Sequence, residues 1–251
     1  MTNPFDLSGR VAVVTGGNTG IGQGIALALA EAGADLALVG RSPAEETAEK
    51  AEALGRHAIL VPADLSTIAP VGEVVDRTLA ELGRLDILVN NAGIIRRADA
   101  VDFSEADWDA VVDTNLKSVF FLCQAAGRHM IAQGKGKIIN IASMLSFQGG
   151  IRVPSYTASK SGVAGLTKLL ANEWAAKGVN VNAIAPGYIA TNNTAALQAD
   201  ESRNRQILER IPAGRWGAPS DLGGAAVFLA SDASDYVNGH ILAVDGGWLA
   251  R

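Results

Sequence analysis

The sequence predicts an α/β fold, a single doubly wound (Rossmann-type) domain with a seven-stranded parallel sheet and helices on both faces. Apolar, β-rich runs alternate with helical patterns along all 251 residues, which is typical of a parallel sheet covered on both faces. A glycine-rich turn at residues 16–22 separates an early apolar run from a helical pattern. The 48% hydrophobic content is enough to bury one core in a chain of this length.

Seven strands and six helices are expected to alternate in order along the chain. Strands are expected near residues 10–15, 35–40, 57–62, 85–90, 137–142, 179–185 and 240–245. Helices are expected near residues 20–32, 43–54, 67–82, 104–132, 155–177 and 220–231. The segment 187–219 is rich in glycine and proline, so we expect it to be irregular and to form a substrate lid within the domain 1–251. Right-handed crossovers place the ligand crevice at the carboxyl ends of the strands.

The glycine-rich turn, Gly16-Gly17-Asn18-Thr19-Gly20-Ile21-Gly22, predicts a phosphate-binding loop. Glycines let the backbone approach a ligand closely, and the following helix offers unpaired amides and a partial positive charge to a pyrophosphate. The literal G-x-G-x-x-G fingerprint is absent because Ile25 takes the place of the third glycine. Taken alone, the turn is equally compatible with a structural role.

Tyr156 and Lys160 form the strongest candidate for chemistry. They lie four positions apart, so on a helix they share a face, and a nearby ammonium lowers the pKa of a phenol toward the range of a general acid/base. Ser143 follows the strand pattern 137–142 and is expected to hydrogen-bond a carbonyl oxygen in the ligand crevice. On its own, the Tyr/Lys pair is more often an incidental feature of a surface helix.

Composition excludes several other classes of protein. The net charge of −5 offers no basic surface for nucleic acid or for a membrane. Cys123 is the only cysteine, so we expect a small buried residue and no internal disulfide. His57, His129 and His240 lack metal-ligand spacing, so no metal is expected. With no signal peptide and no membrane-length apolar run, a cytoplasmic location is expected.

Together, these motifs resemble the short-chain dehydrogenase/reductase family over essentially the whole chain. The resemblance rests on Thr15-Gly16-x-x-x-Gly20-Ile21-Gly22, Asn90-Asn91-Ala92-Gly93, Asn115, Ser143, Tyr156-x-x-x-Lys160 and Pro186-Gly187. It implies an oxidoreductase that uses a nicotinamide cofactor and has Asn115, Ser143, Tyr156 and Lys160 as its catalytic residues. It also implies cofactor-binding positions at Gly16, Asn18, Thr19, Gly20, Ile21, Gly22, Arg41, Asp64, Leu65, Asn91, Ala92, Gly93, Tyr156, Lys160, Pro186, Gly187, Ile189 and Thr191. In the family, Asn115 distorts its helix and binds a water linked to Lys160, and relatives assemble as homotetramers.

Within the family, residues 143–154, 185–194, 210–217 and 244–251 resemble the 2-deoxy-D-gluconate 3-dehydrogenase group, also called 2-dehydro-3-deoxy-D-gluconate 5-dehydrogenase. This implies a keto or hydroxy sugar acid of uronate and pectin breakdown as the substrate. Candidate substrate contacts are Arg97, Met144, Gln148, Arg152, Asn192 and Asn193, with Arg96 a further candidate for the carboxylate. The alternatives are a reductase for another polyol or a 3-oxoacyl thioester, and a non-catalytic nucleotide-sensing protein that kept the fold.

The choice between NAD and NADP depends on the residue after the second strand. No Asp or Glu stands there to bind a ribose 2′-hydroxyl, and Arg41 could instead pair with a 2′-phosphate. However, Asn18 and Thr19 occupy positions where relatives that prefer NADP commonly have a basic residue, and the resembled group generally uses NAD. The sequence-based expectation is therefore NAD, with NADP possible.

Overall fold

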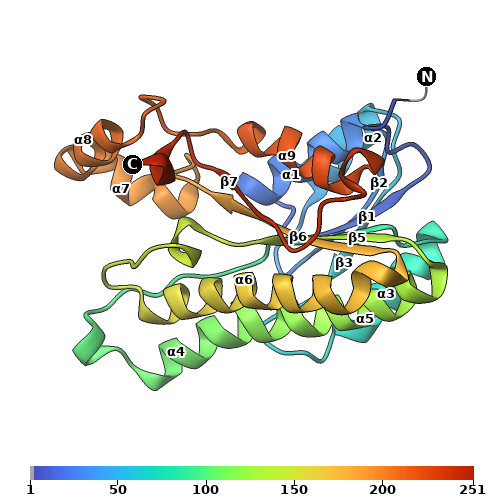
Figure 1. The fold of residues 1–251 in the computed structure, drawn as a ribbon, viewed down its shortest axis with the longest axis horizontal. Coiled ribbons are helices and arrows are strands. Elements are labelled where there is room, and N and C mark those ends of the chain that lie inside the picture. Colours follow the sequence, from blue (N-terminus) through green and yellow to red (C-terminus); the bar gives the residue numbers. More distant parts are fainter. Residues whose placement is uncertain (1–2) are drawn as a thin grey trace.

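The computed structural model describes residues 3–251 and contains one seven-stranded parallel sheet in the order β3-β2-β1-β4-β5-β6-β7 (Figure 1). Its strands are β1 (Val11–Thr15), β2 (Asp35–Gly40), β3 (Ala58–Pro62), β4 (Ile87–Asn90), β5 (Gly136–Ile141), β6 (Val179–Pro186) and β7 (Ile241–Val244). Because the strand order reverses between β1 and β4, a crevice opens at the carboxyl ends of these strands. The predicted doubly wound fold is confirmed.

Helices cover both faces of the sheet (Figure 1). The helices are α1 (Gly20–Glu31), α2 (Glu45–Ala53), α3 (Val71–Leu82), α4 (Glu105–Val112), α5 (Ser118–Gln133), α6 (Pro154–Trp174), α7 (Ala195–Ala199), α8 (Glu201–Arg210) and α9 (Gly223–Ala230). Side chains of α1, α2 and α9 form one apolar core with Ala12 and Val14 of β1. Side chains of α3, α5 and α6 form the other core with Val13 on the opposite face of the same strand. Between residues 3 and 251, no helix is long and apolar enough to cross a bilayer.

The helix expected near residues 104–132 is interrupted by a π-helical turn, Asp113–Lys117, between α4 and α5. Asn115 lies in this turn and is fully buried. Its amide oxygen accepts a hydrogen bond from the Ile94 amide, and its amide nitrogen donates to the Ile94 carbonyl, both at 2.8 Å. The side chain thus bonds to a loop outside the helix, which agrees with the expected distortion at Asn115.

The expectation of an irregular segment at 187–219 was wrong in its middle part, where α7 and α8 form. The Asp200 carboxylate accepts a hydrogen bond from the Arg203 amide and caps α8. Ile207 on α8 is 3% exposed and packs with Ile211 in a small apolar cluster outside the two main cores. A helix with so few apolar side chains gives little periodic signal in the sequence, because its burial depends on residues distant in the chain.

Candidate active site

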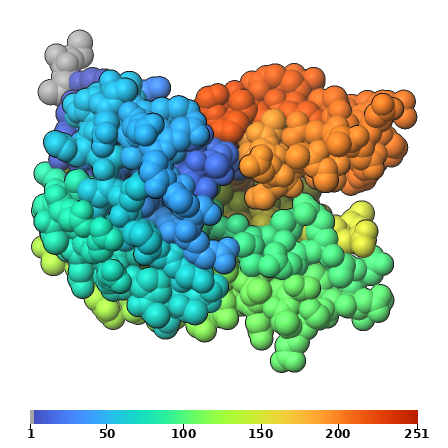
Figure 2. Space-filling view, turned by 180° about the vertical axis from the view of Figure 1, so that it is seen from behind, coloured from blue at the N-terminus to red at the C-terminus, as the bar shows by residue number. Residues whose placement is uncertain are grey.

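Two adjoining cavities lie at the carboxyl ends of the strands. The first has a volume of about 290 Å³, the second about 330 Å³, and both are lined by Gly16, Asn18 and residues 92–94. Figure 2 shows this region as a hollow between the blue N-terminal residues, the green residues and the orange residues. The two cavities together follow the path that a dinucleotide takes across a doubly wound sheet.

The glycine-rich turn fits a pyrophosphate by its packing. Gly16 has a φ of +66°, and a Cβ placed on Gly22 would collide with the Gly16 carbonyl oxygen and the Asn91 amide nitrogen. Asn91 closes the turn by donating hydrogen bonds to the carbonyls of Thr15 and Gly16, at 2.9 and 3.1 Å. Thr19, the residue before α1, makes no side-chain cap, so amides at the start of α1 remain available for an anion.

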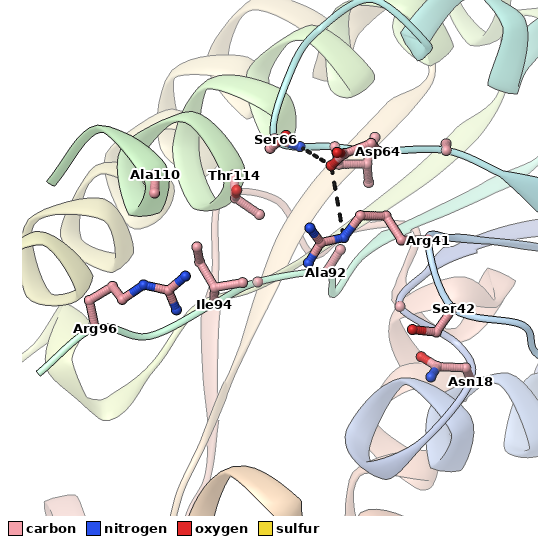
Figure 3. Close-up of a pocket in the computed structure, with 15 residues that line it drawn as sticks. Asn18, Arg41, Ser42, Asp64, Ser66, Ala92, Ile94, Arg96, Ala110 and Thr114 are labelled. Atoms are coloured by element: carbon pink, nitrogen blue, oxygen red, sulfur yellow. Dashed lines mark hydrogen bonds and ion pairs between the residues drawn. The ribbon is translucent and has the colours of Figure 1, made fainter. Parts of the chain in front are cut away.

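The first cavity contains a guanidinium and a carboxylate group on facing loops (Figure 3). Arg41, which follows β2, and Asp64, which follows β3, face each other across it, and the Arg41 Nε lies 3.9 Å from an Asp64 carboxylate oxygen. The Ser66 amide donates to the same Asp64 oxygen at 3.0 Å, and this hydrogen bond is the main reason why the pKa of Asp64 lies below its usual value. Both side chains are more than half exposed and can meet a ligand.

Tyr156 and Lys160 line the second cavity from α6, and the Lys160 Nζ lies 5.7 Å from the centre of the Tyr156 ring. Ser143 follows β5 after one residue, and its hydroxyl lies close enough to Tyr156 to lower the pKa of the phenol. The Ser143 hydroxyl also accepts a hydrogen bond from the Leu145 amide at 3.1 Å, which fixes its position. The structure therefore brings together the phenol, hydroxyl and ammonium groups predicted from the sequence.

Burial dominates the pKa values of this group. It raises the pKa of Tyr156, whereas the nearby Ser143 hydroxyl and the charge of Arg97 lower it. Burial also lowers the pKa of Lys160 to about 8. The structure thus differs from the expected lowering of the phenol pKa by Lys160, because desolvation penalises the phenolate more than the neighbouring charges favour it.

The Lys160 shift predicts a specific pH dependence of stability. Its pKa is about 8 in the folded protein and 10.5 for an ordinary lysine, so in this window the unfolded chain binds more protons and folding gains stability as the pH rises. We expect the free energy of unfolding of the wild type, relative to Lys160→Met, to increase between these pH values by at most about 1.4 kcal/mol per pH unit. Urea denaturation at several pH values measures this difference, and a difference independent of pH would contradict the assignment.

Asn115 lies beside the site rather than on a cavity wall. Its two hydrogen bonds hold the backbone of Ile94, which lines both cavities, and a Cβ placed on Gly93 would lie 3.2 Å from its amide oxygen. The side chain therefore shapes the loop after β4. The expected water link between Asn115 and Lys160 stays a prediction.

The candidate arginines occupy three different environments. Arg97 lines the second cavity together with Tyr156 and Lys160. Arg96 lines the first cavity and forms an ion pair with Asp107 at 3.2 Å. Arg152, with a φ of +63°, forms an ion pair with Asp99 at 3.0 Å and lines neither cavity. The structure does not support Arg152 as a substrate contact, because it is turned toward a carboxylate at the surface.

The other predicted contacts divide into two sets. Thr191, Asn192 and Asn193 line the second cavity from the segment before α7, and Leu65 lines the first cavity. Outside both cavities lie Met144, Gln148, Pro186, Gly187 and Ile189. Of these, Gly187 and Ile189 line a separate cavity of about 200 Å³, and their contact with a cofactor stays a prediction.

Several lining residues were missed from the sequence, among them Ser42, Ser66, Ile94 and Thr114. Ser42 and Ser66 come shortly after β2 and β3, so their position at strand ends was a usable signal. Thr114 gave no such signal, because only the π-helical turn and the packing of α4 bring it to the cavity.

Comparison with known proteins agrees with this geometry. Residues 16–249 match the family described as enoyl-(acyl carrier protein) reductase. The chain is 65% identical, over 98% of both proteins, to the 2-dehydro-3-deoxy-D-gluconate 5-dehydrogenase of Escherichia coli (strain K12).

Solved structures give the same result. A putative 2-deoxy-D-gluconate 3-dehydrogenase from Agrobacterium tumefaciens, with bound NADP, matches with a TM-score of 0.94 and 61% identity over 100% of both chains. A putative NAD(P)-dependent gluconate 5-dehydrogenase from Beutenbergia cavernae, also with bound NADP, matches with a TM-score of 0.95 and 51% identity over 99% of this chain and 100% of that one. With its glycine turn and its Ser143, Tyr156 and Lys160 side chains in place, the chain belongs to the short-chain dehydrogenase/reductase family of nicotinamide-dependent oxidoreductases.

Proposed function

We propose that this protein interconverts 2-dehydro-3-deoxy-D-gluconate and its 2,5-diketo partner in uronate and pectin breakdown. The names of its relatives support the substrate class. The observation that carries the proposal is that Arg97 lines the same cavity as Tyr156 and Lys160. A cation beside the acid/base residue suits a substrate with a carboxylate and a reacting hydroxyl or carbonyl.

In the proposed mechanism, Tyr156 holds the proton that moves at the substrate oxygen. Its raised pKa keeps the phenol protonated at neutral pH, which suits donation to a carbonyl oxygen during reduction. Ser143 hydrogen-bonds the same oxygen and polarises it. The bound nicotinamide supplies or accepts the hydride at the carbon. In the oxidative direction, Tyr156 takes the hydroxyl proton, and the nearby charge of Arg97 favours the phenolate that this requires.

In this proposal Lys160 and Asn115 hold neighbouring backbone segments of the site in place. The buried Lys160 ammonium donates to the Ile141 carbonyl at the end of β5, so α6 is held against the strand that leads to Ser143. In the family the same lysine binds the nicotinamide ribose. Asn115 fixes the loop after β4 through Ile94.

For the cofactor we propose NADP in preference to the NAD expected from the sequence. Arg41 lines the first cavity, no acidic residue directly follows β2, and three similar structures contain NADP. We expect Arg41→Ser to raise the KM for NADP by about tenfold to a hundredfold with little change for NAD, because a charge-assisted bond to the 2′-phosphate is lost. Initial rates with each cofactor measure this ratio.

Asp64→Asn is the matched variant for Arg41, because Asp64 lies opposite Arg41 in the same cavity and is expected to contact the part that NAD and NADP share. It should change the KM for NAD and the KM for NADP by the same factor. A preference for NAD in the wild type, unaffected by Arg41→Ser, would contradict the proposed cofactor.

A panel of substrates separates the proposed activity from the alternatives. The protein is given 2-dehydro-3-deoxy-D-gluconate, an uncharged polyol of similar size, and a 3-oxoacyl thioester with the reduced cofactor. We expect the highest kcat/KM for the sugar acid, because Arg97, Asn192 and Asn193 present polar groups to the cavity. A higher value for the thioester would favour the acyl reductase alternative, and binding of dinucleotide without turnover of any substrate would favour the sensor.

The homotetramer and the cytoplasmic location also stay proposals. The molar mass in solution tests the homotetramer, and cell fractionation tests the location.

A further inference from the structure

A small apolar cluster lies outside the two main cores and joins three parts of the chain. Its buried members are Met144 after β5, Ile207 and Ile211 at α8, and Trp248 near the C-terminus. In Figure 1 the C-terminal end lies beside α7 and α8. The residues that follow Ser143, the lid and the last four residues of the chain therefore pack together.

Trp248 is the centre of this cluster. Its side chain is only 5% exposed, its ring lies 4.0 Å from the Arg210 guanidinium carbon, and its centre lies 4.8 Å from that of the Tyr188 ring. Its indole nitrogen donates to the Gln148 amide oxygen at 3.4 Å. Arg210, at the end of α8, donates to the same oxygen at 3.3 Å. One ring and one amide oxygen thus join the C-terminus, the lid and the loop after β5.

A second contact ties the chain end to the lid. The Arg251 guanidinium donates to the Glu209 carbonyl at 3.0 Å, which satisfies one of the unpaired carbonyls in the last turn of α8. Residues 248–251 therefore touch α8 through a buried ring and through a cap of its C-terminal end.

This cluster connects the segment that carries Ser143 with the segment that lines the second cavity through Asn192 and Asn193. Met144 follows Ser143 directly, and Gln148 lies five residues after it. On the other side, the segment that leads into α7 and α8 includes Asn192 and Asn193, which line the cavity. A displacement of Trp248 would therefore change the distance between Ser143 and the lid residues. It would leave Gly16 and Arg41 in place, because they belong to other elements.

We propose that Trp248 is a positioning residue for the reaction. It holds α8 against the Ser143 loop, so that the substrate side of the cavity keeps its shape while the cofactor side is independent of it. Residues 248–251 then hold the lid closed over the active site of the same chain. The expected change in kcat/KM rests on the proposed function, whereas the expected cofactor Kd and cleavage rate do not.

The test compares Trp248→Ala and Trp248→Phe with Trp108→Ala, a control on α4 whose side chain is 41% exposed and lies outside the cluster. Three quantities are measured on the full chain: kcat/KM for 2-dehydro-3-deoxy-D-gluconate, the Kd of reduced cofactor by fluorescence, and the rate of proteolytic cleavage within residues 187–219 in the absence of substrate. We expect Trp248→Ala to lower kcat/KM by at least about tenfold and to speed cleavage by a similar factor, with the Kd of the cofactor changed by less than about twofold. Trp248→Phe should recover most of the loss, because it keeps the contacts with Arg210 and Tyr188.

Some results would overturn the proposal. Parallel losses of cofactor affinity and of kcat/KM, or wild-type kcat/KM in Trp248→Ala with only a lower Tm, would show a general structural role. If Trp248→Ala does not fold, Gln148→Leu and Arg210→Met replace it, because each removes one partner of Trp248 at a position that is not buried. Unchanged kcat/KM and an unchanged cleavage rate in both variants would overturn the proposal. If the wild type turns over no sugar acid, the proposed function fails, whereas the cleavage rate and the cofactor Kd still decide the role of Trp248.

Discussion

Replacement of Tyr156 with phenylalanine is expected to lower kcat by about 10³-fold, because the phenol lines the cavity beside Arg97 and is the group that we propose exchanges a proton with the substrate oxygen. The Kd of the cofactor should stay within about twofold of the wild-type value, since the ring and the glycine turn remain. Steady-state kinetics and a fluorescence titration with reduced cofactor measure the two quantities.

Tyr236→Phe is the matched control for Tyr156→Phe. It removes the same hydroxyl from a fully exposed tyrosine far from the cavities and should leave kcat unchanged. Retention of more than about a tenth of the activity in Tyr156→Phe would contradict the assigned role, because proton transfer by a positioned side chain contributes at least about 10²-fold.

Replacement of Arg97 with methionine is expected to lower kcat/KM for the sugar acid by about 10²-fold, through loss of a charge-assisted contact with the carboxylate. A second effect follows from the charge of Arg97, which favours the Tyr156 phenolate. Without it the pKa of Tyr156 rises further, so the pH at which the oxidative rate reaches half of its maximum should increase. Both effects are measured from pH profiles of kcat/KM and kcat.

The chain offers two matched controls for this prediction. Arg96→Met and Arg152→Met remove guanidinium groups that form ion pairs with Asp107 and Asp99, and neither lines the cavity that contains Tyr156. Both should leave kcat/KM for the sugar acid within about threefold of the wild-type value. Equal losses in all three variants would show a general effect of surface charge and would contradict a specific role for Arg97.

The fold and the acid/base group could be predicted because their signals are local. Buried parallel strands read as apolar runs, the glycine turn combines a +66° φ at Gly16 with the tight packing of Gly22, and the spacing of Tyr156 and Lys160 is one helical turn. The residues that carry each of these signals are close together in the sequence, although Gly22 also packs against the distant Asn91. The predicted family and fold were correct for this reason.

Features that depend on distant contacts were not predictable in the same way. The helix α8 is stabilised by burial of Ile207 against Met144 and Trp248, which are remote in sequence. Of the three arginines that looked equivalent in the sequence, only the structure shows that Arg96 and Arg152 have carboxylate partners. The pKa of Tyr156 likewise depends on its burial, which outweighs the effects of the Ser143 hydroxyl and the Arg97 charge.

The most direct test of the proposed function is the absorbance of the reduced nicotinamide while the purified protein is given 2-dehydro-3-deoxy-D-gluconate, with NADP and NAD in separate reactions. We predict reduction of the cofactor, faster with NADP at equal concentration, and loss of the signal in Tyr156→Phe. Faster reduction of NAD would keep the chemistry and contradict the role of Arg41. No reduction of either cofactor by a protein that binds both would contradict the assignment of a sugar acid as the substrate.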